Sequence, residues 1–302
     1  MTFFPIKRVD RESAIATEYL GSKPKFWYRD GDRQLLFKAE VRGTGEDWAE
    51  IVASELCDRL GLPHVQYSLA SEFSEGAYQN PGTVCENLAP SPLVLFLGND
   101  LLLAEDAAYP KQQRFKVQQH CRLAVSDAIW VFAPPAGYQS MPKRCQSAGG
   151  AFIGYLMLDA WIANTDRHHE NWGVVWDGQT GCLAPTFDHG AAFGHSLLDV
   201  ERSERLRTRD RNRTVESFAR RGSSALYLSS DTAKPMGLLE AFKAFGELEA
   251  RAADAWLEIL AGIDVDNVSE ILDRIPDDRI STVGREFTLQ LLKTNQRRLL
   301  EK

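Results

Sequence analysis

A dense polar cluster follows an apolar stretch in the middle of the chain. It reads Asn164-Thr165-Asp166-Arg167-His168-His169-Glu170-Asn171, and a second short motif further along reads Phe187-Asp188-His189-Gly190. Between them, residues 172–176 and 183–187 have the composition of two short strands joined by a Gly-containing loop, which predicts a hairpin. Because a hairpin returns the chain to its start, we expect Asp188 to lie beside Asn171 and close to Asp166.

Two carboxylates and an amide oxygen in one place suit phosphoryl transfer from a nucleotide such as ATP. One carboxylate orients the attacking hydroxyl and accepts its proton, while a carboxylate and an amide oxygen hold Mg²⁺ against the phosphates. We predict that Asp166 is the base and that Asn171 and Asp188 are the metal ligands. An Asp, an Asn shortly after it and an Asp-x-Gly beyond a hairpin follow the order of a kinase catalytic segment.

Such chemistry also needs a cation on the phosphates, positioned by a carboxylate on a helix. Lys38 lies inside an apolar run expected to be a strand, and the helical pattern after it contains Glu46, Glu50 and Glu55. We favour Glu50 as the partner because it lies away from the apolar stripe of that helix and need not face the core. The alternatives are an ordinary edge-strand lysine at Lys38 and a plain surface residue at Glu50.

The elements expected around these residues form two different halves. Residues 26–28 and 34–41 predict a hairpin, residues 46–60 a helix ended by Gly61, and residues 65–69 a further strand. Beyond residue 110 the pattern is mostly helical, with helices expected at 114–131, at 151–163 and, with a break near 275–278, over 236–302. The 151–163 helix is apolar on nearly all sides and should be buried.

We therefore expect an α+β protein with a two-lobed, protein kinase-like fold. Residues 1–110 would form a small mixed N-terminal lobe with a sheet, and residues 111–302 a helical C-terminal lobe that carries the catalytic and metal loops. The chemistry would lie between the lobes.

One stretch departs from the average charge. Residues 201–221 contain eight arginines against four acidic residues. The simplest interpretation is a solvated loop; the alternative is a loop that meets an acidic or polyanionic partner, just beyond Asp188 where a kinase would meet its substrate.

The composition sets broad limits on function. With 44% hydrophobic and 25% charged residues, the 302-residue chain is typical of globular proteins. Its net charge of −7 argues against direct, non-specific nucleic-acid binding. Five widely spaced cysteines without a CxxC pair predict neither a disulfide framework nor a zinc knuckle. No signal peptide and no membrane span are recognisable, so a cytoplasmic protein is expected.

Several of these motifs together resemble those of the HipA-like kinases, a group related to phosphatidylinositol 3/4-kinase-like enzymes. The resemblance is strongest at Asn164-Thr165-Asp166-Arg167-x-x-x-Asn171-Trp172 and Phe187-Asp188-His189-Gly190. Within the group, the chain resembles the short bacterial proteins, including the CtkA-type and HipT-type kinases, at Lys23-Pro24-Lys25-Phe26-Trp27, Phe37-Lys38 and Gly45-Glu46-Asp47-Trp48-Ala49-Glu50. The similarity covers most of residues 20–195.

The resemblance implies transfer of the ATP γ-phosphate to a protein Ser or Thr. It places Ser22, Lys23 and Lys25 in a loop over the nucleotide phosphates, with Ser22 as a candidate for autophosphorylation, and His168 as a brace for the catalytic loop. Some relatives are toxins that phosphorylate aminoacyl-tRNA synthetases and are paired with a helix-turn-helix antitoxin. The implied partners are thus a protein substrate, an aminoacyl-tRNA synthetase or another translation factor among them, and such an antitoxin. The implied location is a bacterial cytoplasm, or a host cell into which the protein is delivered.

Three other functions are compatible with parts of the pattern. A lipid kinase would use the same apparatus on a phosphoinositide, and a catalytically silent scaffold would bind nucleotide without transferring phosphate. His168 and His169 beside acidic residues suggest a zinc hydrolase, but adjacent histidines on a loop point in different directions and no third ligand has metal-site spacing.

Overall fold

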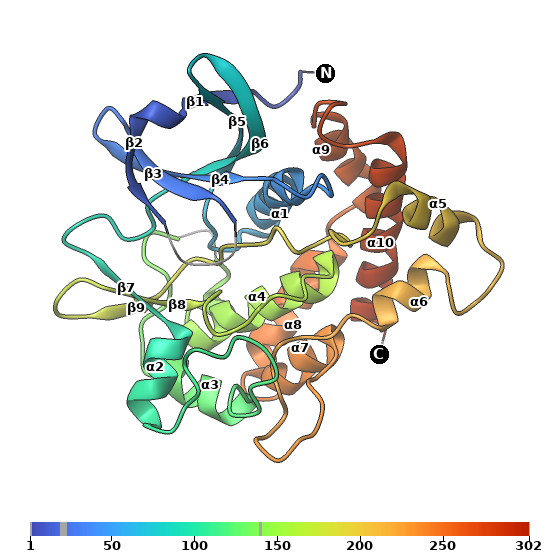
Figure 1. The fold of residues 1–302 in the computed structure, drawn as a ribbon. Coiled ribbons are helices and arrows are strands. Elements are labelled where there is room, and N and C mark those ends of the chain that lie inside the picture. Colours follow the sequence, from blue (N-terminus) through green and yellow to red (C-terminus); the bar gives the residue numbers. More distant parts are fainter. Residues whose placement is uncertain (1, 19–22, 139–140, 302) are drawn as a thin grey trace.

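The N-terminal half of the chain is built on a six-stranded sheet (Figure 1). The computed structural model describes residues 2–18, 23–138 and 141–301. The strands lie in the order β1-β5-β6-β4-β3-β2, and only the β1–β5 pair is parallel. Their bounds are β1 Lys7–Asp10, β2 Ala14–Thr17, β3 Lys25–Asp30, β4 Arg33–Ala39, β5 Tyr67–Ser74 and β6 Ala77–Glu86, with a 3-10 turn at Arg11–Ser13.

The expected hairpin is formed by β3 and β4, and it places Lys38. The two strands pair in register from Lys25 opposite Lys38 to Asp30 opposite Arg33. Successive side chains alternate between the faces of a strand, so Phe37 packs with Phe26 in a small core above the sheet while Lys38 faces the other way. Lys38 lies on a central strand, between β3 and β6, which argues against an edge-strand lysine.

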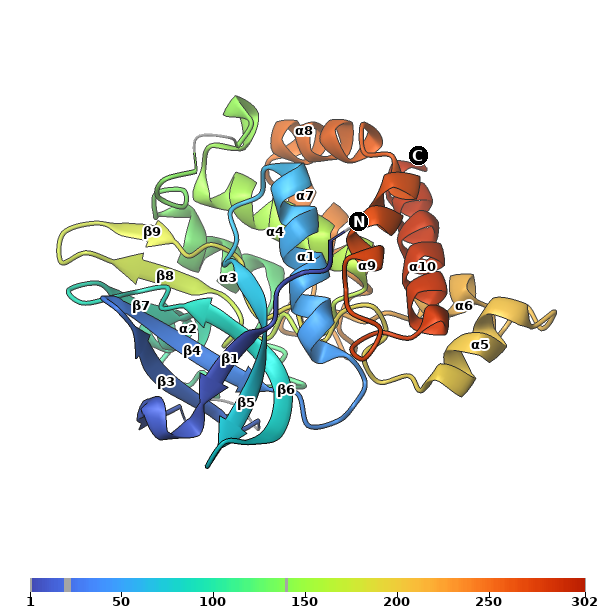
Figure 2. The same ribbon diagram turned by 90° about the horizontal axis from the view of Figure 1, so that it is seen from above.

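Helix α1 (Glu46–Leu60) begins and ends as expected, with Gly61 in the left-handed region at its C-terminus. Its apolar side chains belong to the large core of the helical half rather than to the small core of the sheet. Trp48, for example, stacks on Phe193. The alternative that Glu50 is a plain surface residue is wrong: the residue is 2% exposed, because α1 is covered by the sheet on one side and by helices on the other (Figure 2).

Helix α4 (Ala148–Ile162) forms the centre of the second half, and every one of its residues is buried, as expected. Packed against it are α3 Arg122–Trp130, α7 Leu238–Gly246, α8 Ala250–Ala261 and α10 Thr282–Leu300, while α2 Gly98–Glu105 packs on α3 and α9 Ser269–Asp273 on α10 and α1 (Figure 1). A second sheet, β7 Val94–Leu97, β8 Gly173–Trp176 and β9 Gly181–Leu183, contains the hairpin between the two polar motifs. No helix among the described residues is long and apolar enough to span a membrane.

Several sequence-based expectations in this half are wrong. The strand expected over 183–187 is β9, Gly181–Leu183, and the helix expected over 236–302 with one break is also interrupted between α7 and α8 and between α8 and α9. The helix expected over 114–131 begins only at Arg122, because Cys121 forms an isolated bridge with the distant Tyr227 and Lys116 adopts a positive φ of 60°. The arginine-rich stretch is not a plain loop. It contains α5 (Asp199–Arg207) and α6 (Val215–Arg220), and the Thr214 side chain caps α6 by accepting a hydrogen bond from the Ser217 amide.

A buried arginine near the C-terminus joins the sheet, α1 and the helical half. One guanidinium nitrogen of Arg279 donates to Asp47 Oδ2 (2.6 Å), and the other donates to Ala70 O (2.9 Å) and Ser71 Oγ (2.8 Å). Asp47 is in the first turn of α1 and its other oxygen accepts from the Trp48 amide. One side chain from the last quarter of the chain therefore fixes the start of α1 against β5.

We predict that Arg279→Ala lowers the free energy of unfolding by about 3 kcal/mol or more, because it leaves the buried Asp47 carboxylate without its partner. Urea denaturation followed by circular dichroism measures this. Arg279→Met combined with Asp47→Asn should recover much of the loss, since no buried charge then remains. Arg33→Ala, which removes two exposed ion pairs, with Asp30 and Glu86, should change stability by at most about 1 kcal/mol. Equal free energies of unfolding for Arg279→Ala and Arg33→Ala would contradict the role of Arg279 in joining α1 to β5.

Candidate active site

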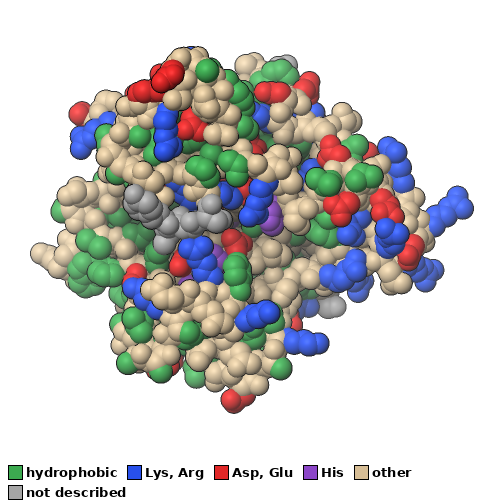
Figure 3. Space-filling model, viewed as in Figure 1, with side chains coloured by type: hydrophobic (Ala, Val, Ile, Leu, Met, Phe, Trp, Pro, Cys, Tyr) green, Lys and Arg blue, Asp and Glu red, His purple; other side chains and the backbone are tan. Residues whose placement is uncertain are grey.

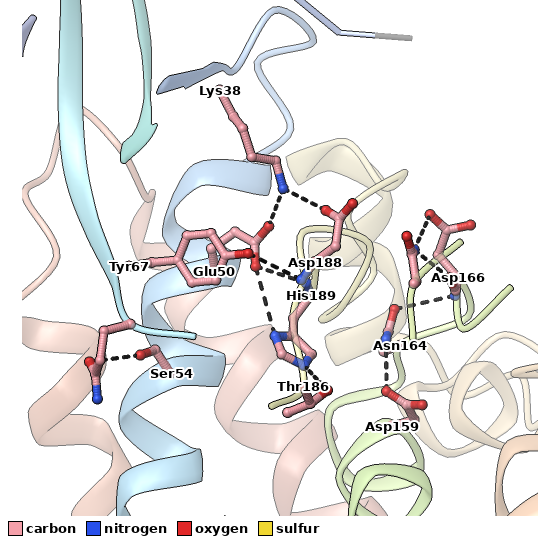
Figure 4. A network of polar contacts seen from close by, with 12 residues as sticks. Lys38, Glu50, Ser54, Tyr67, Asp159, Asn164, Asp166, Thr186, Asp188 and His189 are labelled. Atoms are coloured by element: carbon pink, nitrogen blue, oxygen red, sulfur yellow. Dashed lines mark hydrogen bonds and ion pairs between the residues drawn. The ribbon is translucent and has the colours of Figure 1, made fainter. Parts of the chain in front are cut away.

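Lys38 of β4 connects the sheet to helix α1 and to the loop that contains Asp188 (Figure 4). Its ammonium donates to Glu50 Oε1 at 2.8 Å and to Asp188 Oδ1 at 2.6 Å. Burial alone would lower the pKa of Lys38, but the charges of Asp188 and Glu50 outweigh it and raise the pKa well above its usual value. Lys38 is therefore a buried permanent cation, and the predicted Lys38–Glu50 pair is present.

The three candidate glutamates have distinct partners. Only Glu50 contacts Lys38. Glu46 pairs with Lys23 at the mouth of the cleft, and Glu55 pairs with Arg274 on the opposite side of the helix. The structure thus selects Glu50 among the residues that the helical pattern offered.

Asp188 is held by backbone and side-chain contacts from the other half of the cleft. Its φ of 60° lies in the left-handed region, which non-glycine residues adopt mainly where surrounding contacts enforce it. Its amide donates to the Tyr67 hydroxyl at 3.2 Å, and the next amide, of His189, donates to Glu50 Oε2 at 2.8 Å. Burial raises the pKa of Asp188, but the charges of Lys38 and Lys25 dominate and hold it well below its usual range, so the carboxylate stays ionised.

Asp166 and Asn171 lie together on the loop after α4. The Asn171 side-chain amide donates to Asp166 O at 2.7 Å and more weakly to Asp166 Oδ2 at 3.4 Å. Burial, and then the nearby charge of Asp188, raise the pKa of Asp166 to about 6. At pH 7 the carboxylate is therefore mostly ionised and yet basic enough to take a proton.

This loop is anchored on a fully buried ion pair beneath it. The Asp159 carboxylate of α4 accepts two hydrogen bonds of 2.8 Å from Arg167 and one of 2.7 Å from the side-chain amide of Asn164. Arg167 in turn donates to Asn171 O at 2.8 Å, and Asn164 Oδ1 accepts from the Asp166 amide at 3.2 Å. The buried helix thus fixes both ends of the loop that presents the carboxylate.

The two adjacent histidines point in different directions, as expected. His168 Nδ1 accepts a hydrogen bond from the Glu170 amide at 3.1 Å, which braces the loop and places the ring proton on Nε2. Burial lowers the pKa of His168 to about 4, so the ring is neutral at pH 7. His169 turns into the core, where its Nδ1 and the Tyr109 hydroxyl lie 2.7 Å apart. Nothing in this arrangement supports a zinc site.

One cavity of about 380 Å³ brings the predicted residues together. Those that line it are Lys23, Lys25, Lys38, Asp166, His168, Asn171 and Asp188. Glu50 lies behind Lys38, and Ser22 falls outside the described residues. Glu46, Thr165 and Glu170, which belong to the sequence motifs, also line it. The lining residues without a sequence signal are Arg42, Arg114, Phe115, Ala191 and His195.

Arg114 and Phe115 form the wall beside Asp166 that sequence reasoning missed. Arg114 Nε lies 2.5 Å from Glu170 Oε2. Phe115 is 56% exposed and its ring meets His168 edge-on at 5.5 Å. Both residues lie in the part of the expected 114–131 helix that is not helical, so their position next to the loop of Asp166 has no signal in the local pattern.

A second, mostly apolar cavity of about 320 Å³ opens from the first and shares Lys25, Lys38 and Asp188 with it. Its apolar walls come from Trp27, Leu36, Val65, Leu88, Leu95, Leu97 and Phe187. These residues come from both sheets, from the connection after β6 and from the segments before β5 and after β9, so no single stretch of sequence identifies the cavity. A flat apolar slot that ends on a lysine and a carboxylate suits a purine base followed by phosphates.

The side-chain oxygens of Asn171 and Asp188 fit a magnesium ion. Asn171 uses its amide nitrogen within the loop, and Asp188 uses Oδ1 for Lys38, which leaves one oxygen of each side chain for other ligands. No group of three or more His, Cys, Asp or Glu in the described part of the chain could hold a metal ion. Mg²⁺ does not need one, because it commonly takes one or two protein ligands together with water and phosphate oxygens.

Comparison with known sequences gives no relative. No protein-family model matches the chain, and no curated protein matches it either.

Comparison with solved structures gives matches over almost the whole chain. The crystal structure of the proinflammatory kinase CtkA of Helicobacter pylori matches with a TM-score of 0.67 at 18% identity, covering 97% of this chain and 99% of that one. HipA of Shewanella oneidensis MR-1, from a complex with HipB and operator DNA, matches with a TM-score of 0.50 at 12% identity, covering 94% of this chain and 65% of that one. The expected α+β, two-lobed kinase-like fold, shared with CtkA and HipA, is confirmed.

Proposed function

We propose that the protein is an ATP- and Mg²⁺-dependent kinase of the HipA-like type that transfers the γ-phosphate to a Ser or Thr hydroxyl of a protein. The observation that carries the proposal is a single cleft in which Lys38, held by Glu50 and Asp188, faces Asp166 and Asn171. The likeness in fold to two kinases supports it.

In this proposal the purine occupies the apolar cavity and the phosphates extend over Lys38. Lys23, Lys25 and Arg42 line the phosphate end and would add positive charge there. Asn171 and Asp188 would hold Mg²⁺, which offsets the charge of the phosphates when bound. Glu50 acts by keeping Lys38 in place.

Asp166 would orient the acceptor hydroxyl and take its proton. The hydroxyl oxygen forms a bond to the γ-phosphorus, the bond from phosphorus to the β,γ-bridging oxygen breaks, and ADP leaves. The anchored loop contributes by positioning, which is the larger part of catalysis in such reactions. His168 stays neutral and supports the loop.

The partners follow from the resemblance rather than from the cleft. The solved complex of HipA with HipB and operator DNA supports including a helix-turn-helix antitoxin among the proposed partners. A substrate in the translation machinery, and autophosphorylation at Ser22, remain predictions from the sequence motifs.

We predict that Asp166→Asn lowers phosphate transfer by about 10²- to 10⁴-fold, because the acceptor hydroxyl loses its base, while ATP binding persists. Phosphate transfer is measured by the label that passes from γ-labelled ATP to the protein itself and to lysate proteins. ATP binding is measured by thermal shift with ATP and Mg²⁺.

Phosphoinositide vesicles are included in the transfer assay as a second acceptor. Label in the vesicles alone would indicate a lipid kinase, and stabilisation by ATP with no transfer by the unmodified protein would indicate a scaffold. Full transfer by Asp166→Asn would remove Asp166 from the mechanism.

The same variant should be more stable than the unmodified protein at pH 7. The pKa of Asp166 is raised from 3.8 to about 6 on folding, so the folded state binds more protons between these values and the ionised carboxylate costs stability above them. Asn carries no such cost, and the difference should vanish as the pH falls below 4. Urea denaturation at both pH values measures it.

Asp177→Asn is the matched control for this prediction. Hydrogen bonds from the Thr180 and Gln179 amides lower the pKa of Asp177, so its ionised form is favoured by folding and the variant should lose stability at pH 7. A loss of stability in both variants would contradict the raised pKa of Asp166.

A further inference from the structure

A groove on the helical half shares no lining residue with the catalytic cleft. It has a volume of about 800 Å³ and lies between the first turn of α7, the start of α3 and the segment that follows α6. Its apolar part consists of Leu228, which is 44% exposed, the half-buried Leu239 and the edge of the buried Leu238. The groove therefore offers water-exposed apolar surface away from the proposed chemistry.

Basic side chains dominate the charge around this apolar surface. Arg122, Arg220, Lys243 and Arg298 line the groove against two acidic residues, Glu240 and Glu247.

The two carboxylates are already engaged. Glu247 pairs with Arg122, and Glu240 caps α7 by accepting from the Gly237 amide. Lys243 is exposed and takes part in no ion pair of the described residues. Arg220 pairs with Glu216 of α6, which is outside the lining. The groove thus has more cations than carboxylates, and Lys243 and Arg298 have no carboxylate partner among the described residues.

The positive surface continues beyond the groove. Arg220 lies at the end of α6, and the segment before it carries Arg207, Arg209, Arg211 and Arg213, all exposed. Figure 3 shows basic side chains gathered over α5 and α6, at the right of the molecule. Burial lowers the pKa of Arg298, and so does the neighbouring charge of Arg220, as expected where like charges are crowded. This surface contrasts with the net charge of −7 of the whole chain.

We propose that this groove is a docking site for an acidic segment of a partner protein in which apolar side chains alternate with carboxylates. The leucines would bury the apolar side chains of the segment, and Lys243 and Arg220 would pair with its carboxylates. The N-terminus of α7, a nine-residue helix, faces the groove and favours negative charge.

A nucleic acid fits the groove less well. Its affinity would come from phosphate contacts and from aromatic side chains on which bases stack, and the groove contains leucines but no aromatic side chain among its lining residues. An acidic peptide uses both the apolar and the basic surface. The docking proposal does not depend on phosphate transfer, so the binding test can contradict it without contradicting the proposed function.

The test is fluorescence anisotropy with the full-length protein and a short labelled peptide of alternating Leu and Glu. We expect saturable binding that weakens with added salt, and much weaker binding of the same peptide with Gln in place of Glu. Lys243→Glu and Arg220→Glu should each weaken binding about tenfold, or about 1.4 kcal/mol, and Leu228→Gln should weaken it without changing the salt dependence. Circular dichroism verifies that each variant is folded.

Lys143→Glu is the matched control. Lys143 is an exposed lysine of the same half, outside the groove, and its charge reversal should leave binding unchanged. Equal binding of the Glu and Gln peptides, unchanged binding by Lys243→Glu, tighter binding of a labelled single-stranded RNA, or no binding of any probe would each overturn the proposal.

Discussion

The ion pairs of Lys38 hold the proposed active site together. A buried ammonium is costly to desolvate unless its charge is matched, and here Glu50 and Asp188 match it from two other parts of the chain. Glu50 also accepts from the His189 amide. A strand, a helix and the loop after a distant hairpin are therefore joined at one point. If any of the three were displaced, it would leave a buried charge without a partner.

The arrangement of the cores explains how this point is kept in place. Helix α1 contributes its apolar side chains to the large core around α4, and Arg279 ties its first turn to β5. The loop with Asp166 rests on Asp159 of the same α4. Glu50, Asp166 and Asp188 are thus supported by one packed body, and Lys38 reaches them from a sheet that has a separate small core.

Local patterns in the sequence were sufficient for much of the fold and for the first residues of the site. The alternation around Lys38, the helix from Glu46 and the apolar helix before Asn164 were visible because each element has a period and an end signal. A hairpin brings its ends together by geometry, which correctly placed Asp188 near Asn171.

The remaining features depend on contacts between segments far apart in the chain. Arg114 and Phe115 reach the cleft because the chain turns before Cys121 and bridges to Tyr227, which no local pattern contains. The apolar cavity draws on both sheets. The two helices in the arginine-rich stretch are a different case, since Glu201 near the start of α5 and Arg207 at its end complement the helix dipole. These charges at the two ends of α5 were visible in the sequence, but the high overall charge of the stretch favoured a solvated loop.

The two charged regions of the molecule, the cleft and the groove beside α7, differ in burial and in pairing of their charges. In the cleft, cations and carboxylates lie close together and are buried, so each charge fixes the position of another, and a nucleotide would enter a site whose geometry already exists. In the groove beside α7 the cations outnumber the carboxylates. Lys243 is exposed and has no ion-pair partner among the described residues, so its charge positions nothing within the chain. Exposed charges of one sign mainly set the rate and specificity of association, whereas buried pairs set geometry. A catalytic site needs buried pairs that set geometry, and a docking surface needs exposed charges that set the rate and specificity of association. In this chain the two proposed sites lie on cavities that share no lining residue.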